Sequence, residues 1–108
     1  MPNVYIDNDL AKLVAKLSAL RIATPISNPH YKEITNLYIE ASDDQTKAID
    51  KAIDDADKDY NEFSAGMGQA IKAINEAIKD IEKIAKTVKI LAKVVELAGN
   101  LVSAIAAA

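Results

Sequence analysis

The side chains in this sequence that could do chemistry are mainly carboxylates. Two acidic groups have the spacing of a single helix face: Glu40, Asp43 and Asp44, and Asp50, Asp54 and Asp57. Such groups could offer oxygen ligands to a metal ion. A di-metal site in a helical bundle also needs histidines that converge from other helices, and the chain has only one histidine. We therefore interpret both groups as solvated acidic faces and expect no metal site.

The remaining polar groups point to no active site. His30 follows Pro29 at a predicted helix start, where a surface position is expected. The four tyrosines suit the edge of a core or an interface, with their hydroxyls in contact with water. The sequence has no cysteine, glycine-rich phosphate loop, nucleophile elbow or metal-ligand spacing. We expect a non-enzymatic protein with no catalytic residues, no cofactor and no small-molecule substrate.

Composition indicates an all-α fold. The chain has 108 residues, which suits one domain over residues 1–108. Half of the residues are hydrophobic, many of them alanine, and three glycines and three prolines interrupt a sequence otherwise rich in helix formers. The formal charge is -3, and the basic residues form no dense cluster. Nucleic-acid binding is therefore not expected.

The two ends of the sequence bear on where the protein is located in the cell. Residues 1–7 have neither a basic nor an apolar stretch of the kind found in export signals. The longest uncharged run covers twelve residues, 97–108, whereas a membrane-spanning helix needs about 20. We expect a cytoplasmic protein or one exported without a cleavable signal. Contact of the C-terminal helix with a membrane remains an open alternative.

The first helix is predicted over residues 8–23. Its apolar residues recur at spacings of three and four, the pattern of one buried helix face: Leu10, Leu13, Leu17 and Leu20. The acidic and amide side chains at positions 7–9 suit the N-terminus. The helix should end before Thr24, because the residue that precedes a proline is disfavoured in helical geometry.

Two longer helices are predicted to follow, over residues 29–65 and 69–106. Asn28 would cap the second helix, with Pro29 at its first position. Gly66 and Gly68 suggest a turn over residues 64–68, in which Gly66 adopts a left-handed conformation. The alternative is one helix that passes through both glycines. The predicted fold is a short N-terminal helix packed on a long antiparallel helical hairpin, with a three-helix base and a two-helix coiled-coil stalk.

The third predicted helix carries an apolar seam whose spacing alternates between four and three. The exception is the pair of three-residue steps at Ile78, Ile81 and Ile84, which would locally overwind a coiled coil.

Charge is distributed unevenly along the predicted hairpin. Residues 43–62 hold eight acidic residues and three lysines, and residues 72–93 hold six lysines and three acidic residues. A fold-back near residue 65 would place Asp57 near Lys72 and Asp50 near Lys79. Exposed pairs of this kind contribute about 0–1 kcal/mol each, so they would set the register more than the stability. The alternative is that both segments are solvated faces.

The C-terminal half of the third predicted helix is apolar over most of its circumference, and a helix of this kind must be covered on most sides. The first helix is too short to do this alone, so a further partner is expected. The predicted contact residues are Leu10, Leu13, Leu17, Leu20, Val88, Leu91, Val94, Val95, Leu97, Leu101, Val102 and Ile105.

Three functional hypotheses follow from this surface. The first is a protein that acts by self-association or by contact with a helical protein partner, as an oligomer, filament or coat subunit, or adaptor. The second is a membrane-active hairpin that inserts its C-terminal helix. The third is a monomeric three-helix domain that binds a partner helix.

Overall fold

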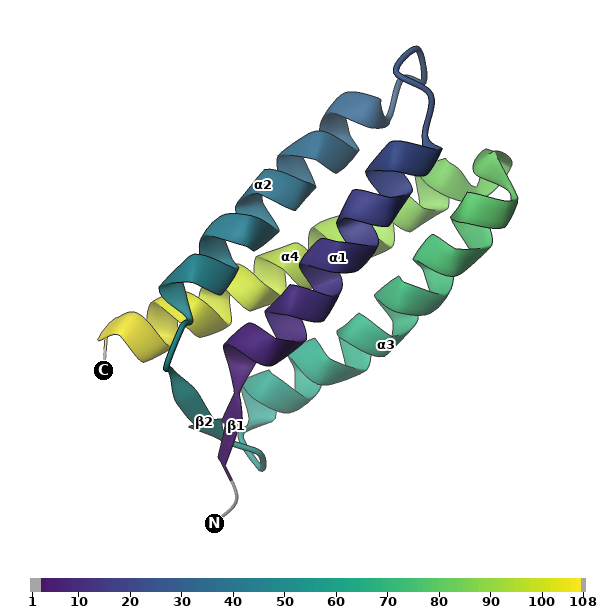
Figure 1. Ribbon diagram of the computed structural model, residues 1–108. Helices are drawn as coiled ribbons and strands as arrows, with labels where there is room; N and C mark the ends of the chain where they lie inside the picture. The colour runs from purple at the N-terminus through teal and green to yellow at the C-terminus, as the bar shows by residue number, and fades with distance from the viewer. Residues whose placement is uncertain (1–2, 108) are drawn as a thin grey trace.

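Four helices run side by side along the 45 Å axis of the molecule, each antiparallel to the next in the chain (Figure 1). The computed structural model describes residues 3–107, with side chains from residue 4 to residue 105. The helices are α1 (Ile6–Ala23), α2 (Tyr31–Lys47), α3 (Lys58–Lys79) and α4 (Ile84–Ala107), with a short 3-10 helix η1 (Ile81–Lys83) before α4. Residues 1–2 and 108, which belong to the terminal segments considered above, lie outside the described residues. The predicted all-α fold is confirmed.

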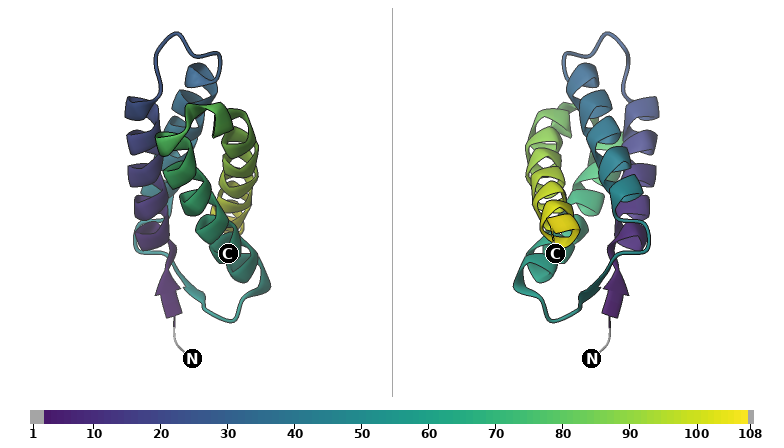
Figure 2. Two further views of the ribbon diagram at one scale, coloured as in Figure 1. Left: turned by 90° about the vertical axis from the view of Figure 1, so that its right-hand side faces the viewer. Right: turned by 90° about the vertical axis from the view of Figure 1, so that its left-hand side faces the viewer.

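The helices form a four-cornered bundle. α1 packs against α2 and α3, and α4 also packs against α2 and α3 (Figure 2). α2 and α3 therefore lie diagonally across the bundle, as do α1 and α4. One consequence is that the outer surface of α2 and the outer surface between α3 and α4 are different faces of the molecule.

The α1 prediction is confirmed to within two residues at its start. Its four leucines at positions 10, 13, 17 and 20 are fully buried, as their spacing requires. No side chain caps its N-terminus, because the N-cap position is held by Tyr5, which lacks the short side-chain oxygen of a capping residue. The predicted cap at Asn28, with Pro29 at the first helical position, is wrong: α2 begins at Tyr31 and its N-cap residue is His30, with no side-chain cap. The Asn28 side-chain oxygen instead accepts a 2.9 Å hydrogen bond from the His30 amide in the turn that precedes the helix.

The predicted helix over residues 29–65 is wrong. α2 ends at Lys47, and residues 52–54 form a strand, β2 (Ala52–Asp54), antiparallel to β1 (Asn3–Tyr5), with Val4 opposite Ile53. Asp50, in the turn between α2 and β2, has a left-handed backbone with φ of 64°. Aspartates favour this departure from helix, because a short carboxylate can bond to nearby backbone amides. The Asp54 side chain does so, accepting a 2.9 Å hydrogen bond from the Ala56 amide.

The predicted turn at Gly66 and Gly68 is also wrong, and the alternative of an unbroken helix is confirmed. Both glycines lie within α3. The predicted third helix over 69–106 instead breaks at Asp80, whose backbone is extended and whose carboxylate accepts a 3.2 Å hydrogen bond from the Glu82 amide. The irregular spacing near Ile81 therefore marks a turn between two helices and not an overwound coiled coil.

The position of this turn removes the long hairpin, its stalk and its predicted charge pairs. The chain folds back at residues 80–83 rather than 64–68. Asp57 and Lys72 consequently belong to the same helix: Asp57 is the N-cap of α3 and Lys72 lies further along it. They are about 20 Å apart along the helix axis at ~1.5 Å per residue. Among the described side chains of residues 4–105, the His30 Nδ1 atom lies 3.3 Å from a Glu33 carboxylate oxygen, and no lysine is paired with a carboxylate.

Candidate interaction groove

The acidic residues with apparent ligand spacing are dispersed by the fold. Asp50 lies in a turn, Asp54 ends β2, and Asp57 caps α3. Glu40, Asp43 and Asp44 remain together on α2. Across the described part of the chain, no group of three or more His, Asp or Glu side chains has the geometry to hold a metal ion.

The predicted contact residues lie mostly in the core of a single chain. Ten of the twelve are buried, and only Leu97 and Ile105 are half-buried. The prediction assumed a short α1 as the one neighbour of the apolar C-terminal helix. The structure instead covers α4 with α2 on one side and α3 on the other. Burial within the chain therefore accounts for these residues without a second copy.

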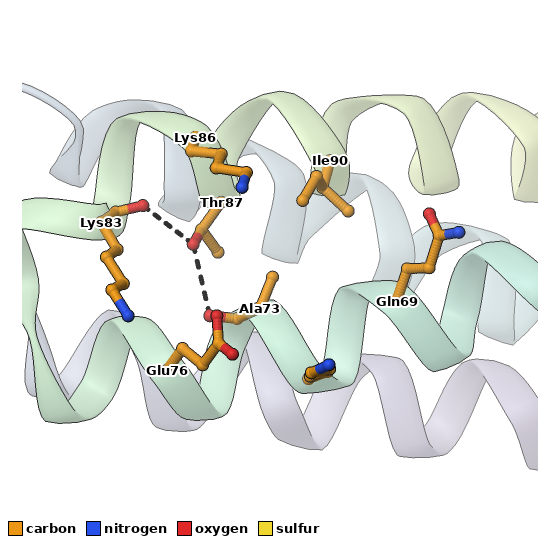
Figure 3. A pocket seen from close by; sticks show the side chains of 8 residues that line it. Gln69, Ala73, Glu76, Lys83, Lys86, Thr87 and Ile90 are labelled. Atoms are coloured by element: carbon orange, nitrogen blue, oxygen red, sulfur yellow. Dashed lines mark hydrogen bonds between the residues drawn. The ribbon is translucent and has the colours of Figure 1, made fainter.

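A groove lies between α3 and α4 on the outer surface. It consists of two hollows of about 420 Å³ and about 280 Å³ that share Gln69 and Ile90. The first hollow is shown in Figure 3, where side chains from both helices face one another across it. We call this feature the α3–α4 groove. Its lining residues are Gly66, Gln69, Lys72, Ala73, Glu76, Lys83, Lys86, Thr87, Lys89, Ile90, Lys93, Val94 and Leu97.

The rim of the α3–α4 groove is strongly basic. Five lysines line it, and Glu76 is the one acidic side chain among the lining residues. Lys83, Lys86 and Lys93 come from η1 and α4 at helical spacing, so they follow the same edge. All five lysines are exposed, which leaves their ammonium groups in water and their aliphatic stems over the groove.

The floor of the groove is apolar and closely packed. Gly66 lets α4 approach α3, since a Cβ atom at this position would lie 3.1 Å from Cγ2 of Val94. The buried Thr87 hydroxyl lies between the two helices, within hydrogen-bond distance of two carbonyl oxygens: 3.0 Å from that of Lys83 and 3.3 Å from that of Ala73 (Figure 3). Ile90 and Leu97 complete the floor and are half-buried. The groove thus offers apolar contact along its base and positive charge along its edges.

The other side of α4 has the opposite charge. A hollow of about 340 Å³ between α2 and α4 is lined by three carboxylates of α2, at positions 40, 43 and 44, and by Glu96, with Lys47 as the one basic group among its lining residues. Burial raises the pKa of Asp44 above its ordinary value. Lys47 opposes this rise, while the charges of Glu40 and Asp43 add to it.

The basic rim is visible in the sequence as an excess of lysine, although the predicted hairpin assigns these lysines as partners of acidic residues. The excess of lysine over residues 72–93 was expected to neutralise the acidic residues 43–62 across a hairpin. The chain turns at residues 80–83 instead, so the predicted register between the two segments does not form and the lysines are not paired with carboxylates among the described residues.

Comparison with known proteins gives no match: no family model, no curated protein and no solved structure is similar to this chain. Within the described residues, no helix is both long enough and apolar enough to cross a membrane. The functional inference therefore depends on the geometry and charge of the surface.

Proposed function

We propose that the chain is a non-enzymatic interaction protein that binds an acidic amphipathic helix in its α3–α4 groove. The observation that carries this proposal is the basic rim on an apolar floor: five lysines surround a base formed by Ile90, Val94 and Leu97. An amphipathic helix placed in such a groove would direct its apolar stripe onto the floor and its carboxylates towards the lysines.

The two parts of the groove would have different roles in binding. Apolar contact with the floor supplies most of the affinity, because exposed charge pairs contribute little in water. The lysines select for acidic partners, speed association and make it dependent on salt. Glu76 lies at the end of the groove near Lys83, so basic residues of a partner would be tolerated only there.

A small anion fits the groove less well than a helix does. The lysine ammonium groups are exposed and the groove is open to solvent along its length. A small ligand would therefore gain only screened contacts with mobile side chains. An extended partner gains from every lysine and also covers the apolar floor.

Binding of two designed peptides tests the proposal. One is a 17-residue amphipathic helix with a leucine stripe flanked by glutamates, and the other has lysines in place of the glutamates. We expect the acidic peptide to bind in fluorescence anisotropy at low ionic strength and the basic peptide not to bind. The variant Lys86→Glu/Lys89→Glu should weaken binding by about tenfold or more, corresponding to about 1.4 kcal/mol.

The matched control is Lys12→Glu/Lys58→Glu, which makes the same change in charge at exposed lysines of α1 and α3 outside the groove. This control should bind the acidic peptide nearly as the wild type does. Equal losses in both double variants would show that net charge, and not the groove, is responsible. Lipid-dependent sedimentation with phosphatidylserine vesicles, in the absence of peptide binding, would also overturn the proposal.

A further inference from the structure

We propose that the acidic helix bound by the α3–α4 groove is α2 of a second copy of this chain. This inference rests on the function proposed above and specifies the partner. It has three requirements. The outer face of α2 must present an apolar side chain among carboxylates, and α2 must be as long as the groove. The outer face of α2 must also remain accessible in a molecule whose own groove is occupied.

The first requirement is met by Ile39. Its side chain is 54% exposed although it lies in the middle of α2, far from the loops at either end. Glu40 is adjacent in sequence, and Asp43 lies one helical turn further on, on the same side of the helix. Both carboxylates are exposed. The middle of the outer face of α2 thus carries an isoleucine with two carboxylates beside it, while the exposed Lys32 and Lys47 lie on the same face about two turns away, towards the two ends of the helix.

Length and position also fit. α2 has 17 residues and is about 25 Å long, and the α4 side of the groove, from Lys83 to Leu97, extends over about 21 Å at ~1.5 Å per residue. α2 is diagonal to α3 in the bundle, so its outer face and the groove do not overlap. One molecule can therefore use both surfaces at the same time.

The charge distribution along the groove indicates an orientation. The middle of the groove, at Ile90, should receive Ile39, because Ile39 is the central residue of α2. Asp43 then lies about 6 Å further along, towards Lys86 and Lys83, if α2 runs antiparallel to the α4 helix that it contacts. The carboxylates of α2 thereby meet lysines of the rim, and Lys47, in the last turn of α2, lies towards the end of the groove that holds Glu76.

Two other surfaces of the chain are less suitable occupants. The turn around Ile49 is exposed, but it carries Lys47 and Lys51 beside one aspartate, and its left-handed residue Asp50 and the strand β2 prevent it from lying along a straight groove. The exposed Ile22 and Ile26 flank the end of α1, close to Arg21, and would bring positive charge towards the lysines.

An interface between two different surfaces does not close on itself in a dimer. Each added copy leaves one groove and one α2 free, so the assembly continues as a chain or closes into a ring. A single helix in a groove forms a small interface, so association should be weak, observable at concentrations up to about 1 mM, and reduced by salt.

Charge reversal on each surface provides the decisive experiment. The groove variant is Lys86→Glu/Lys89→Glu, and the α2 variant is Glu40→Lys/Asp43→Lys. In sedimentation velocity the wild type should form species larger than a dimer as concentration rises, and each variant alone should remain a monomer. An equimolar mixture should form species larger than either variant forms alone, because the unaltered groove of one variant binds the unaltered α2 of the other, whereas a mixture that remains monomeric would refute this pairing. In that mixture the α2 variant supplies the intact groove and the groove variant supplies the intact α2.

Isoleucine substitutions identify the occupant. Ile39→Asn should abolish association, whereas the matched changes Ile26→Asn and Ile49→Asn, at positions 81% and 52% exposed, should leave it unchanged. All three replace an exposed side chain, and circular dichroism should show equal helix content. The assignment to α2 would be overturned if Ile49→Asn lost self-association while Ile39→Asn associated as the wild type does.

The outcome also separates this inference from the proposed function. A wild-type chain that remains monomeric at about 1 mM and low salt, but still binds the acidic peptide in its groove, would refute the second copy as partner and leave the groove function in place. Absence of both self-association and peptide binding would refute both proposals.

Discussion

The Tyr60 hydroxyl donates a 2.8 Å hydrogen bond to Oδ2 of Asp9, a residue 51 positions earlier in the chain. This bond joins the start of α3 to the first turn of α1. Lys16 and Asn75 form a second link between the same helices, with 3.1 Å from the ammonium nitrogen to the amide oxygen. Burial of Tyr60 and its hydrogen bond to Asp9 raise the pKa of the tyrosine above 10.0.

We expect Tyr60→Phe to lower the free energy of unfolding by about 0.5–1.5 kcal/mol, the usual contribution of one hydrogen bond. The ring would still pack against the core, so helix content should not change. Urea denaturation followed by circular dichroism at pH 7 measures the effect. A loss well above this range would mean that the ring, and not the hydroxyl, had been disturbed.

The same residue should produce a pH dependence at the alkaline end. The folded chain keeps the Tyr60 proton more tightly than the unfolded chain, so this contribution to stability is complete below pH 10 and declines as the pH rises through the raised pKa. Urea unfolding from pH 8 to pH 11 should show a steeper loss in the wild type than in Tyr60→Phe. Parallel profiles would contradict the raised pKa.

Asp57 is the N-cap of α3, and its carboxylate accepts hydrogen bonds of 2.9 Å and 3.1 Å from the amides of Asp59 and Tyr60. We expect Asp57→Ala to destabilise the fold by about 1 kcal/mol. Asp55→Ala removes the same charge two residues earlier at an exposed position and should have a much smaller effect. Thermal unfolding of the two variants measures the difference, and equal losses would assign the effect to charge alone.

The two glycines of α3 form a matched pair. Gly68→Ala should stabilise the protein by about 0.5–1 kcal/mol, because alanine favours helix and a Cβ at this position meets no atom within 4 Å. Gly66→Ala should give a smaller gain or a loss, because its Cβ would lie 3.1 Å from the buried Val94. Denaturation midpoints of the two variants test this order. A larger gain for Gly66→Ala would indicate a looser contact between α3 and α4.

Asp44 should weaken the folded state at neutral pH. Burial raises its pKa above 3.8, so the folded chain binds this proton more tightly and stability falls as the pH rises through the raised pKa. We expect Asp44→Asn to raise stability at pH 7 by about 0.2–0.5 kcal/mol, the typical effect of relieving a like-charge pair such as Glu40–Asp44. Urea unfolding at pH 4 and pH 7 should show a smaller pH dependence in the variant.

The same substitution distinguishes stability from assembly. Asp44→Asn removes a carboxylate next to the proposed contact face of α2, so it should weaken self-association while it stabilises the monomer. Asp43→Asn, at an exposed position, is the control: it should weaken association with little effect on unfolding. An Asp44→Asn variant that is both more stable and more associated would contradict the proposed role of the acidic face.

The parts of the fold that the sequence predicted correctly are those fixed by local pattern. The leucines of α1 repeat at helical spacing, and Asn28 before Pro29 is a local signal for a helix start. The α1 prediction agrees with the structure because burial of the leucines reinforces it, whereas α2 begins two residues after Pro29, with His30 as its N-cap.

The errors occurred where tertiary contacts outweigh local preference. Gly66 resembles a helix end in sequence, but its close contact with Val94 holds it within α3. The strand β2 forms because β1, which lies about fifty residues earlier, pairs with it, and no local pattern in residues 52–54 reveals that partner. The groove was missed for a related reason, since the lysines that form its rim were assigned to the wrong helix pair.

The pairing of β1 with β2 divides the chain into two successive halves. Residues 3–54 form a segment whose two ends are held together by backbone hydrogen bonds, with the α1–α2 hairpin between them, and residues 58–107 form a second hairpin. Most contacts within each half join neighbouring elements, a topology associated with rapid folding. During synthesis the first half can close before the lysine-bearing half emerges, and docking of two preformed hairpins would then be the last step in reaching the native state.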